Sequence, residues 1–224
     1  MKKSTPYLLL VPALLFTVFV LVYPLVQNLI NSFSDVSMIT GRSGWTGFDN
    51  YEHVFEDALF WRSFRNTSVY AVVGTALALA MGLGFALLMN LKLGKIGTIM
   101  GCLYTVPWVI SPVVAGFAWK WLLNDNFGVV NHWLAYAGLA KIGTTWLGNP
   151  GTALFCVMLA RIWQFYPFAM VMFLAGLQSI PQEQYEAAAV DGATMIKRFF
   201  YITLPNLKTV SSVLLVLGVI WSFN

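Results

Sequence analysis

The most regular feature of the sequence is a series of long apolar runs separated by shorter polar stretches. A helix needs about 20 mainly apolar residues to cross the hydrocarbon core of a bilayer. Four runs reach that length, at residues 7–29, 68–90, 96–119 and 152–179. A fifth run begins near residue 209 and extends to residue 224, which is short for a span. The pattern predicts an all-α polytopic membrane protein whose fifth span is incomplete in this sequence.

The composition favours burial in lipid over a soluble fold. Hydrophobic residues make up 58% of the chain and charged residues only 10%, whereas a soluble domain carries roughly 25% charged residues. So few charged side chains cannot cover the surface of a soluble protein of this length. The net charge of +4 is spread out without a basic run, so no nucleic-acid partner is expected.

The first apolar run is interpreted as a retained span and not as a secretion signal. It is longer than the roughly 7–15 residues of a signal-peptide core, and no A-x-A cleavage site follows it. With the N-terminus in the cytoplasm, the inside segments hold seven Lys and Arg residues and the outside loops hold five. Because positive residues favour the cytoplasmic side, this modest bias places the N-terminus inside.

Small residues and prolines mark three of the spans. Ala76, Ala80 and Gly84 recur at four-residue spacing, which predicts a face for close helix packing in lipid. The third span contains Pro107 and Pro112, and the fourth contains a proline at position 167. Broken helices in membranes occur where they line a cavity or are buried in protein. The prolines therefore indicate either a pathway wall or ordinary kinks.

The two outside loops, residues 31–65 and 122–151, are polar but contain short aromatic pieces. Residues 48–55 and 127–136 are predicted to form small interfacial helices that an external partner could touch.

The segment at residues 180–205 has the features of a helical elbow on the cytoplasmic side. Pro181 suits the first turn of a helix, and Gly192 supplies the left-handed residue that ends it. A second short helix is predicted at about residues 194–201, with Pro205 stopping it. Such an elbow fits a groove on a soluble protein. It would equally suit an interfacial connector on lipid head groups, since Lys197 and Arg198 favour that surface.

Several fixed positions in this segment resemble the EAA loop of binding-protein-dependent ABC importer permeases. They are Glu186-Ala187-Ala188, Asp191-Gly192-Ala193 and Ile202-Thr203-Leu204-Pro205. The resemblance extends over nearly the whole chain, and it is of the carbohydrate type found in maltose and glycerol-3-phosphate importers. The further matching stretches are Gly47–Tyr51, Phe60-Trp61, Asn66-Thr67, Asn126–Asn131, Trp146-Leu147 and Ala175–Gln178.

The resemblance implies a transport subunit of the type I permease fold that is not itself an enzyme. The elbow is then a coupling helix seated in a cleft of a separate ATPase dimer. Glu186 would be the polar anchor, two alanines would permit close approach and Gly192 would make the turn. The full implied coupling set is Glu186, Ala187, Ala188, Asp191, Gly192, Leu204 and Pro205. The sequence has no G-x-x-x-x-G-K-[ST] phosphate loop, so ATP and magnesium are expected on the partner, and this chain is expected to bind no cofactor.

The resemblance also implies a second permease subunit, forming a heterodimer, and an extracytoplasmic solute-binding protein. The location would be the bacterial cytoplasmic membrane. The implied substrate pathway comprises Tyr104, Trp108, Arg161, Gln164, Phe165, Phe168 and Ser222. Arg161 departs from a neutral sugar site, because it carries a positive charge. A charged residue at membrane depth is a candidate functional residue. It could contact an anionic or polyol solute, or pair with a partner subunit.

Two other classes of function are less consistent with the sequence. A secondary transporter would show inverted repeats and membrane carboxylates, but the spans contain no Asp or Glu. A membrane-embedded enzyme would need a catalytic constellation at membrane depth, and neither catalytic nor metal-binding residues are identified. Members of the resembled family continue through the fifth and a sixth span. A truncated membrane fragment that does not transport is therefore a further alternative.

Overall fold

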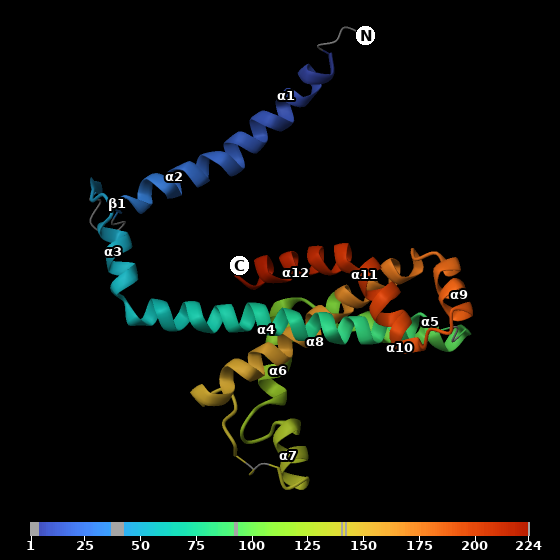
Figure 1. Cartoon of the computed structure of the whole chain (residues 1–224). Helices are drawn as coiled ribbons and strands as arrows, with labels where there is room; N and C mark the ends of the chain where they lie inside the picture. The colour runs from blue at the N-terminus through green and yellow to red at the C-terminus, as the bar shows by residue number, and fades with distance from the viewer. Residues whose placement is uncertain (1–4, 37–42, 92–93, 140, 142, 224) are drawn as a thin grey trace. The chain divides into compact units, whose positions relative to one another are not determined.

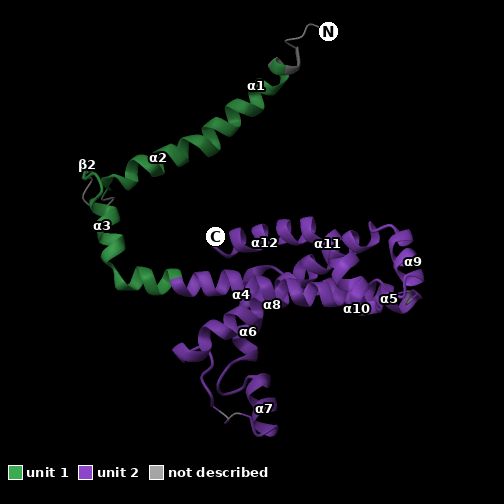
Figure 2. Ribbon diagram, in the orientation of Figure 1, with its two compact units in different colours: residues 1–64 green, residues 65–224 purple. Residues whose placement is uncertain are grey.

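The computed structural model describes residues 5–36, 43–91, 94–139, 141 and 143–223. These residues are mainly helical and fall into two compact units, Met1–Phe64 and Arg65–Asn224 (Figure 2). Within the described residues, three helices are long and apolar enough to cross a membrane. Two bent helix pairs also qualify if each pair counts as one span, which gives up to five. The predicted helical membrane fold is confirmed.

Unit 1 consists of helices joined by a small hairpin. Its elements are α1 (Thr5–Thr17), the π-helical turn η1 (Val18–Val22), α2 (Tyr23–Ser32), β1 (Ser34–Val36), β2 (Ser43–Trp45), α3 (Asp49–Glu56) and the start of α4 (Ala58–Met89). The first span candidate covers Leu9–Ser32. The helix α3 lies where the aromatic piece at residues 48–55 predicted one.

The hairpin is a local feature that was not predicted from the sequence. β1 and β2 pair antiparallel, with Ser34 opposite Trp45. Phe33 stacks on Trp45 with ring centroids 5.6 Å apart. The Asn50 amide donates to the carbonyls of Ser32 and Ser34 at 3.0 and 3.1 Å. Strands of three residues are too short to show an alternating pattern, and these side-chain contacts hold the hairpin together.

Unit 2 contains the remaining helices, arranged around α8 (Figure 1). They are the rest of α4, then α5 (Gly94–Val109), α6 (Pro112–Leu122), α7 (Val129–Tyr136), α8 (Pro150–Gln178), α9 (Gln182–Val190), α10 (Met195–Arg198), the π-helical turn η2 (Phe199–Thr203), α11 (Leu204–Asn206) and α12 (Lys208–Ser222). The long helix α8 packs against α5, α6 and α12. Its buried Met170 and Phe173 join Ala86, Leu207 and Leu214 in one core.

The buried small face of α4 is not the predicted one. Ala76, Ala80 and Gly84 are exposed in the described chain, so this predicted packing face makes no close contact with the chain's own helices. The buried small residues are Ala71, Gly74, Thr75, Ala78, Gly82 and Ala86. Gly82 fits directly against α8, where an added Cβ would lie 2.7 Å from the Ala169 Cβ. Both faces of α4 carry small residues, and the face that contains Gly82 is the one that packs against α8.

Each π-helical turn in the described chain ends two residues before a helical proline. η1 is followed by Tyr23 and Pro24, and η2 by Leu204 and Pro205. The wide turn lets the Leu204 N–H reach the carbonyl of Phe199, so the chain stays helical where the proline lacks a donor and crowds the preceding turn. The prediction that Pro205 stops the helix is therefore wrong, because the helix continues to Asn206.

The third predicted span is a broken helix. α5 ends at Val109, α6 begins at Pro112, and their axes differ by 96°. Pro112 occupies the first turn of α6, where its missing N–H costs nothing. In contrast, α8 runs through Pro167 without interruption. The second span starts at Ala58, ten residues before the predicted start at 68.

A buried asparagine organises the loop around α7. Asn131 is completely buried, and its amide donates to the carbonyls of Asn124 and Thr144 at 2.8 and 3.1 Å. Its side-chain oxygen accepts a hydrogen bond from the indole N–H of Trp146. The helix α7 matches the aromatic piece predicted at residues 127–136.

Candidate functional site

The helical elbow predicted from the sequence is present as two short helices at one end of unit 2 (Figure 1). The first helix, α9, ends at Val190, and Gly192 follows with φ of +73°. The Ala193 N–H then donates to the carbonyl of Ala188 at 2.8 Å. This closure is typical of a helix that ends in a left-handed glycine. The predicted turn at Gly192 is confirmed.

Side-chain hydrogen bonds tie α9 to the helical segment that precedes α12. The Tyr185 hydroxyl bonds the buried Thr203 hydroxyl at 2.9 Å. The Asn206 amide donates to the Gln184 side-chain oxygen at 3.2 Å. Across the turn, Arg198 Nε donates to the carbonyl of Ala193 at 2.9 Å. The elbow is therefore fixed to the helical segment that leads into α12.

Replacing Tyr185 with phenylalanine is expected to lower the stability of the elbow by about 1 kcal/mol. The change removes one hydrogen bond and leaves the buried Thr203 hydroxyl without this partner. The thermal unfolding midpoint of the detergent-solubilised chain measures the effect. Tyr201→Phe is the matched control, since Tyr201 lies in the same segment and is 81% exposed. Equal effects of the two changes would show that the Tyr185–Thr203 hydrogen bond does not stabilise the elbow.

The outer surface of the elbow exposes large apolar side chains beside acidic ones. Val190, Met195 and Ile196 are 89%, 84% and 71% exposed. Glu186 is also exposed, and its carboxylate accepts a hydrogen bond from Gln182 at 2.8 Å. A groove of about 710 Å³ follows this surface; its lining includes Tyr185, Met195, Ile196, Arg198, Phe199 and Phe200. Large exposed apolar side chains on a stiff turn are typical of a docking surface.

The structure separates the predicted coupling residues into two groups. Glu186, Ala187, Ala188, Asp191 and Gly192 lie on the elbow itself. Leu204 and Pro205 line a different hollow of about 520 Å³, beside Leu79 and Lys208.

Most of the predicted pathway residues gather around one hollow of about 350 Å³ in unit 2. Its lining is Trp108, Ile110, Pro112, Arg161, Gln164, Phe165 and Trp221. On α8 the positions 161, 164, 165 and 168 share one helix face, because they are three or four residues apart. Phe168 closes the group, with ring centroids 5.4 Å from Trp108 and 5.6 Å from Trp221. We refer to this hollow as the aromatic pocket.

The break between α5 and α6 contributes a polar group to the aromatic pocket. Ile110 lies between the two helices, and its carbonyl accepts a hydrogen bond from the Gln164 amide at 2.9 Å. Arg161 places its guanidinium 4.5 Å from the centroid of the Phe165 ring. Arg161 Nη2 is buried, and no hydrogen-bond partner for it lies within the described part of the chain.

Besides Phe168, which packs on the rings of the lining, the predicted pathway residues Tyr104 and Ser222 are also not part of it. The Tyr104 ring packs on Phe85 with centroids 4.6 Å apart, and its carbonyl accepts from the Tyr166 hydroxyl. The Ser222 hydroxyl donates to the carbonyl of Gly218 at 2.6 Å. Conversely, the lining includes Trp221, Ile110 and Pro112, which sequence reasoning missed. The two prolines of the third span were the available signal for the last two, since they indicated a broken helix.

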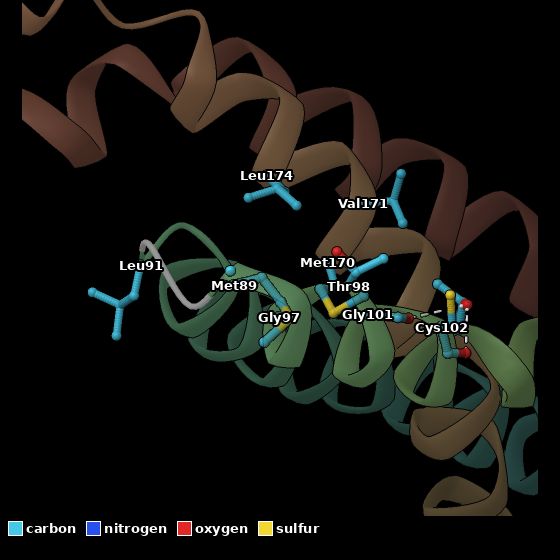
Figure 3. A pocket seen from close by; sticks show the side chains of 11 residues that line it. Met89, Leu91, Gly97, Thr98, Gly101, Cys102, Met170, Val171 and Leu174 are labelled. Carbon is cyan, nitrogen blue, oxygen red and sulfur yellow. Dashed lines mark hydrogen bonds between the residues drawn. The ribbon is translucent and has the colours of Figure 1, made fainter.

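A second hollow, of about 530 Å³, lies between α5 and α8 (Figure 3). Its wall includes Gly97, Thr98, Gly101 and Cys102 from α5 and Met170, Val171 and Leu174 from α8. The Thr105 hydroxyl at its edge donates to the Cys102 carbonyl at 2.9 Å, which occupies this donor within its own helix. The wall is mainly apolar and small, so it suits helix packing better than recognition of a polar solute.

The described residues contain no group of three or more His, Cys, Asp or Glu side chains that could hold a metal ion.

Comparisons with known proteins agree with this geometry. Residues 78–224 match the family described as binding-protein-dependent transport system inner membrane component. The sulfoquinovosyl glycerol transport system permease protein of Agrobacterium fabrum is 39% identical over 90% of this chain and 65% of its own length. The trehalose/maltose transport system permease protein of Thermococcus litoralis is 34% identical over 96% of this chain and 72% of its own length.

A solved structure shows the same fold. It is the crystal structure of a bacterial ABC transporter involved in the import of the acidic polysaccharide alginate. One of its chains superimposes with a TM-score of 0.82 at 25% identity, covering 97% of this chain and 72% of that one. The family match, the two relatives and the shared fold together confirm the resemblance carried by residues 186–205. The chain belongs to the family of binding-protein-dependent transport system inner membrane components.

Proposed function

We propose that this chain is a membrane-spanning permease subunit of an ATP-driven importer that moves a carbohydrate or related polyol by alternating access. The carrying observation is a short helical connection with a single bend. The elbow leads through α11 and a 62° bend at Leu207 into α12, and the far end of α12 supplies Trp221 to the aromatic pocket. A displacement of the elbow is thereby passed to the wall of the pocket.

The length and stiffness of α12 suit this transmission. A helix rises about 1.5 Å per residue, so the 15 residues of α12 carry motion over roughly 22 Å. Leu207 and Leu214 are completely buried against the core, which keeps the helix in contact with α8. An ATPase that binds one position of the elbow more tightly than another shifts the equilibrium between two conformations of the pocket. The size of the shift is limited by the difference between the two binding affinities.

The proposed importer contains three kinds of partner besides this chain. A separate ATPase dimer would bind ATP and magnesium and receive the elbow, with Glu186 as its polar anchor. A second permease subunit would complete the pathway. A solute-binding protein would dock on the outside loops; the matched alginate importer was also solved in complex with an alginate-bound periplasmic protein. The cytoplasmic membrane of a bacterium, with the N-terminus inside, is the location consistent with the charge bias.

The named solutes of the relatives support the proposed substrate class. They include trehalose, maltose and the acidic polysaccharide alginate. The aromatic pocket fits such solutes, since aromatic faces stack on sugar rings while a few polar groups fix their orientation.

Cysteine crosslinking tests the proposed orientation and the ATPase contact. In a chain carrying Cys102→Ser and Cys156→Ala, Val190→Cys is expected to crosslink to an ATPase subunit and to resist a membrane-impermeant maleimide added outside. Tyr136→Cys is the matched control, since Tyr136 is 92% exposed on α7, and it is expected to react from outside. Labelling of Val190→Cys from outside, or its failure to meet any partner, would refute the proposal.

A further inference from the structure

Arg161 introduces a full positive charge into the middle of a membrane helix. It lies in α8, which qualifies as a span, and it lines the aromatic pocket. A charged side chain at the centre of a bilayer costs at least about 2.5–3.5 kcal/mol. Hydrophobic packing alone does not explain such a residue, because an apolar side chain would line the pocket without this cost.

Arg161 has a buried hydrogen-bond donor that no described residue of the chain accepts. A guanidinium has five N–H donors in a planar fork and accepts no hydrogen bonds. The Phe165 ring, 4.5 Å away, interacts with the face of the guanidinium, and that contact leaves its edge free to donate. Nη2 is buried and has no partner within the described residues. A buried donor of this kind calls for an acceptor.

This chain offers no carboxylate for that role. Its nine acidic residues lie at positions 35–57, 125 and 183–191, outside the span that holds Arg161. Within the aromatic pocket, the Gln164 amide already donates to the Ile110 carbonyl at 2.9 Å. The remaining lining is aromatic or apolar. The lining of the aromatic pocket therefore supplies no negatively charged acceptor to the buried Nη2.

We propose that the aromatic pocket takes a sugar or polyol that carries an acidic group, such as a carboxylate, phosphate or sulfonate. Two oxygens of that group accept hydrogen bonds from the edge of the Arg161 guanidinium, a geometry that the fork favours. The apolar face of the solute stacks on Trp108 and Trp221, which are 49% and 45% exposed. This inference rests on the proposed transport function and narrows its substrate class.

Matched pairs of acidic and neutral probes test the inference on the importer complex purified through a tag on this chain. The pairs are glucuronic acid with glucose, and sn-glycerol 3-phosphate with glycerol, each titrated calorimetrically. At least one acid is expected to bind 10-fold or more tightly than its neutral twin. Arg161→Gln should reduce that ratio below 2-fold, and Arg161→Lys should retain part of it. Lys120→Gln, which removes an exposed charge from α6, should leave the ratio unchanged.

Three outcomes would overturn the inference. Acids and their neutral twins could bind equally, the preference could survive Arg161→Gln, or Arg161→Gln could release the second permease subunit because Arg161 pairs with a partner carboxylate. A different result would show that the proposed transport function is wrong. If no ATPase co-purifies with the chain, the importer proposal fails, and the same titrations on the chain alone still decide whether Arg161 selects acids.

Discussion

Reversing the charge at Glu186 is expected to lower solute uptake by the assembled importer at least about 100-fold. Glu186 is an exposed acidic residue of the elbow, and the proposed function assigns it to the contact with the ATPase. A charge of the wrong sign at a close interface costs several kcal/mol. About 2.8 kcal/mol already weakens binding 100-fold. The effect of Glu186→Lys is measured by uptake of radiolabelled solute and by co-purification of the ATPase.

Glu183→Lys is the matched control for this experiment. Glu183 is also exposed and lies in the first turn of the same helix. Its reversal removes only a favourable interaction with the helix dipole, worth about 0.3–1 kcal/mol. The Glu186 variant should reach the membrane in normal amounts and lose the ATPase, whereas the control keeps it. Normal uptake and ATPase binding in Glu186→Lys would disprove the coupling role.

Placing a leucine at Gly82 is expected to destabilise unit 2 by about 3 kcal/mol, at the upper end of the usual cost of overpacking. An added Cβ there would lie 2.9 Å from the Met170 backbone nitrogen and 3.0 Å from the Tyr166 carbonyl oxygen. Backbone atoms of a long helix cannot turn aside as a flexible side chain does, so α4 and α8 must separate. The thermal unfolding midpoint in detergent and the amount of chain in the membrane report the change.

The matched control is Gly84→Leu. Gly84 is exposed on the same helix, and an added Cβ there meets nothing within 4 Å. Its expected effect is within about 0.5 kcal/mol, as for most substitutions away from packed positions. If both leucine variants unfold alike, the intimate contact of Gly82 with α8 does not determine stability.

The two sites differ in how a mutation should affect transport. In the proposed mechanism, changes on the elbow are expected to act on the coupling between ATPase and pocket, whereas changes at Arg161 are expected to act on the choice of solute. α12 connects them, since it begins beside the elbow and carries Trp221 at its other end. Glu186→Lys is therefore expected to reduce uptake of every solute equally, and Arg161→Gln to alter the ratio between acidic and neutral ones.

Features that depend on local chain chemistry were predictable from the sequence. Apolar runs of spanning length identify the membrane helices, because each run must cover its own backbone in lipid. Gly192 identifies the end of α9, since a left-handed residue without a Cβ is a local requirement. The elbow motif around Glu186 is also contiguous, so its resemblance to known permeases could be recognised without any tertiary contact.

Features that depend on contacts between distant residues were decided by the tertiary structure. The helix α4 has small residues on two faces, and packing against α8 determines that Gly82 and not Gly84 is buried. The Trp221 side chain reaches the aromatic pocket because α12 lies along α8, while the neighbouring Ser222 bonds its own helix. Helical periodicity gives the relative directions of side chains on one helix, but the partner helix determines which direction is inside. The sequence thus determined the membrane helices and the elbow, and helix packing determined which residues surround Arg161.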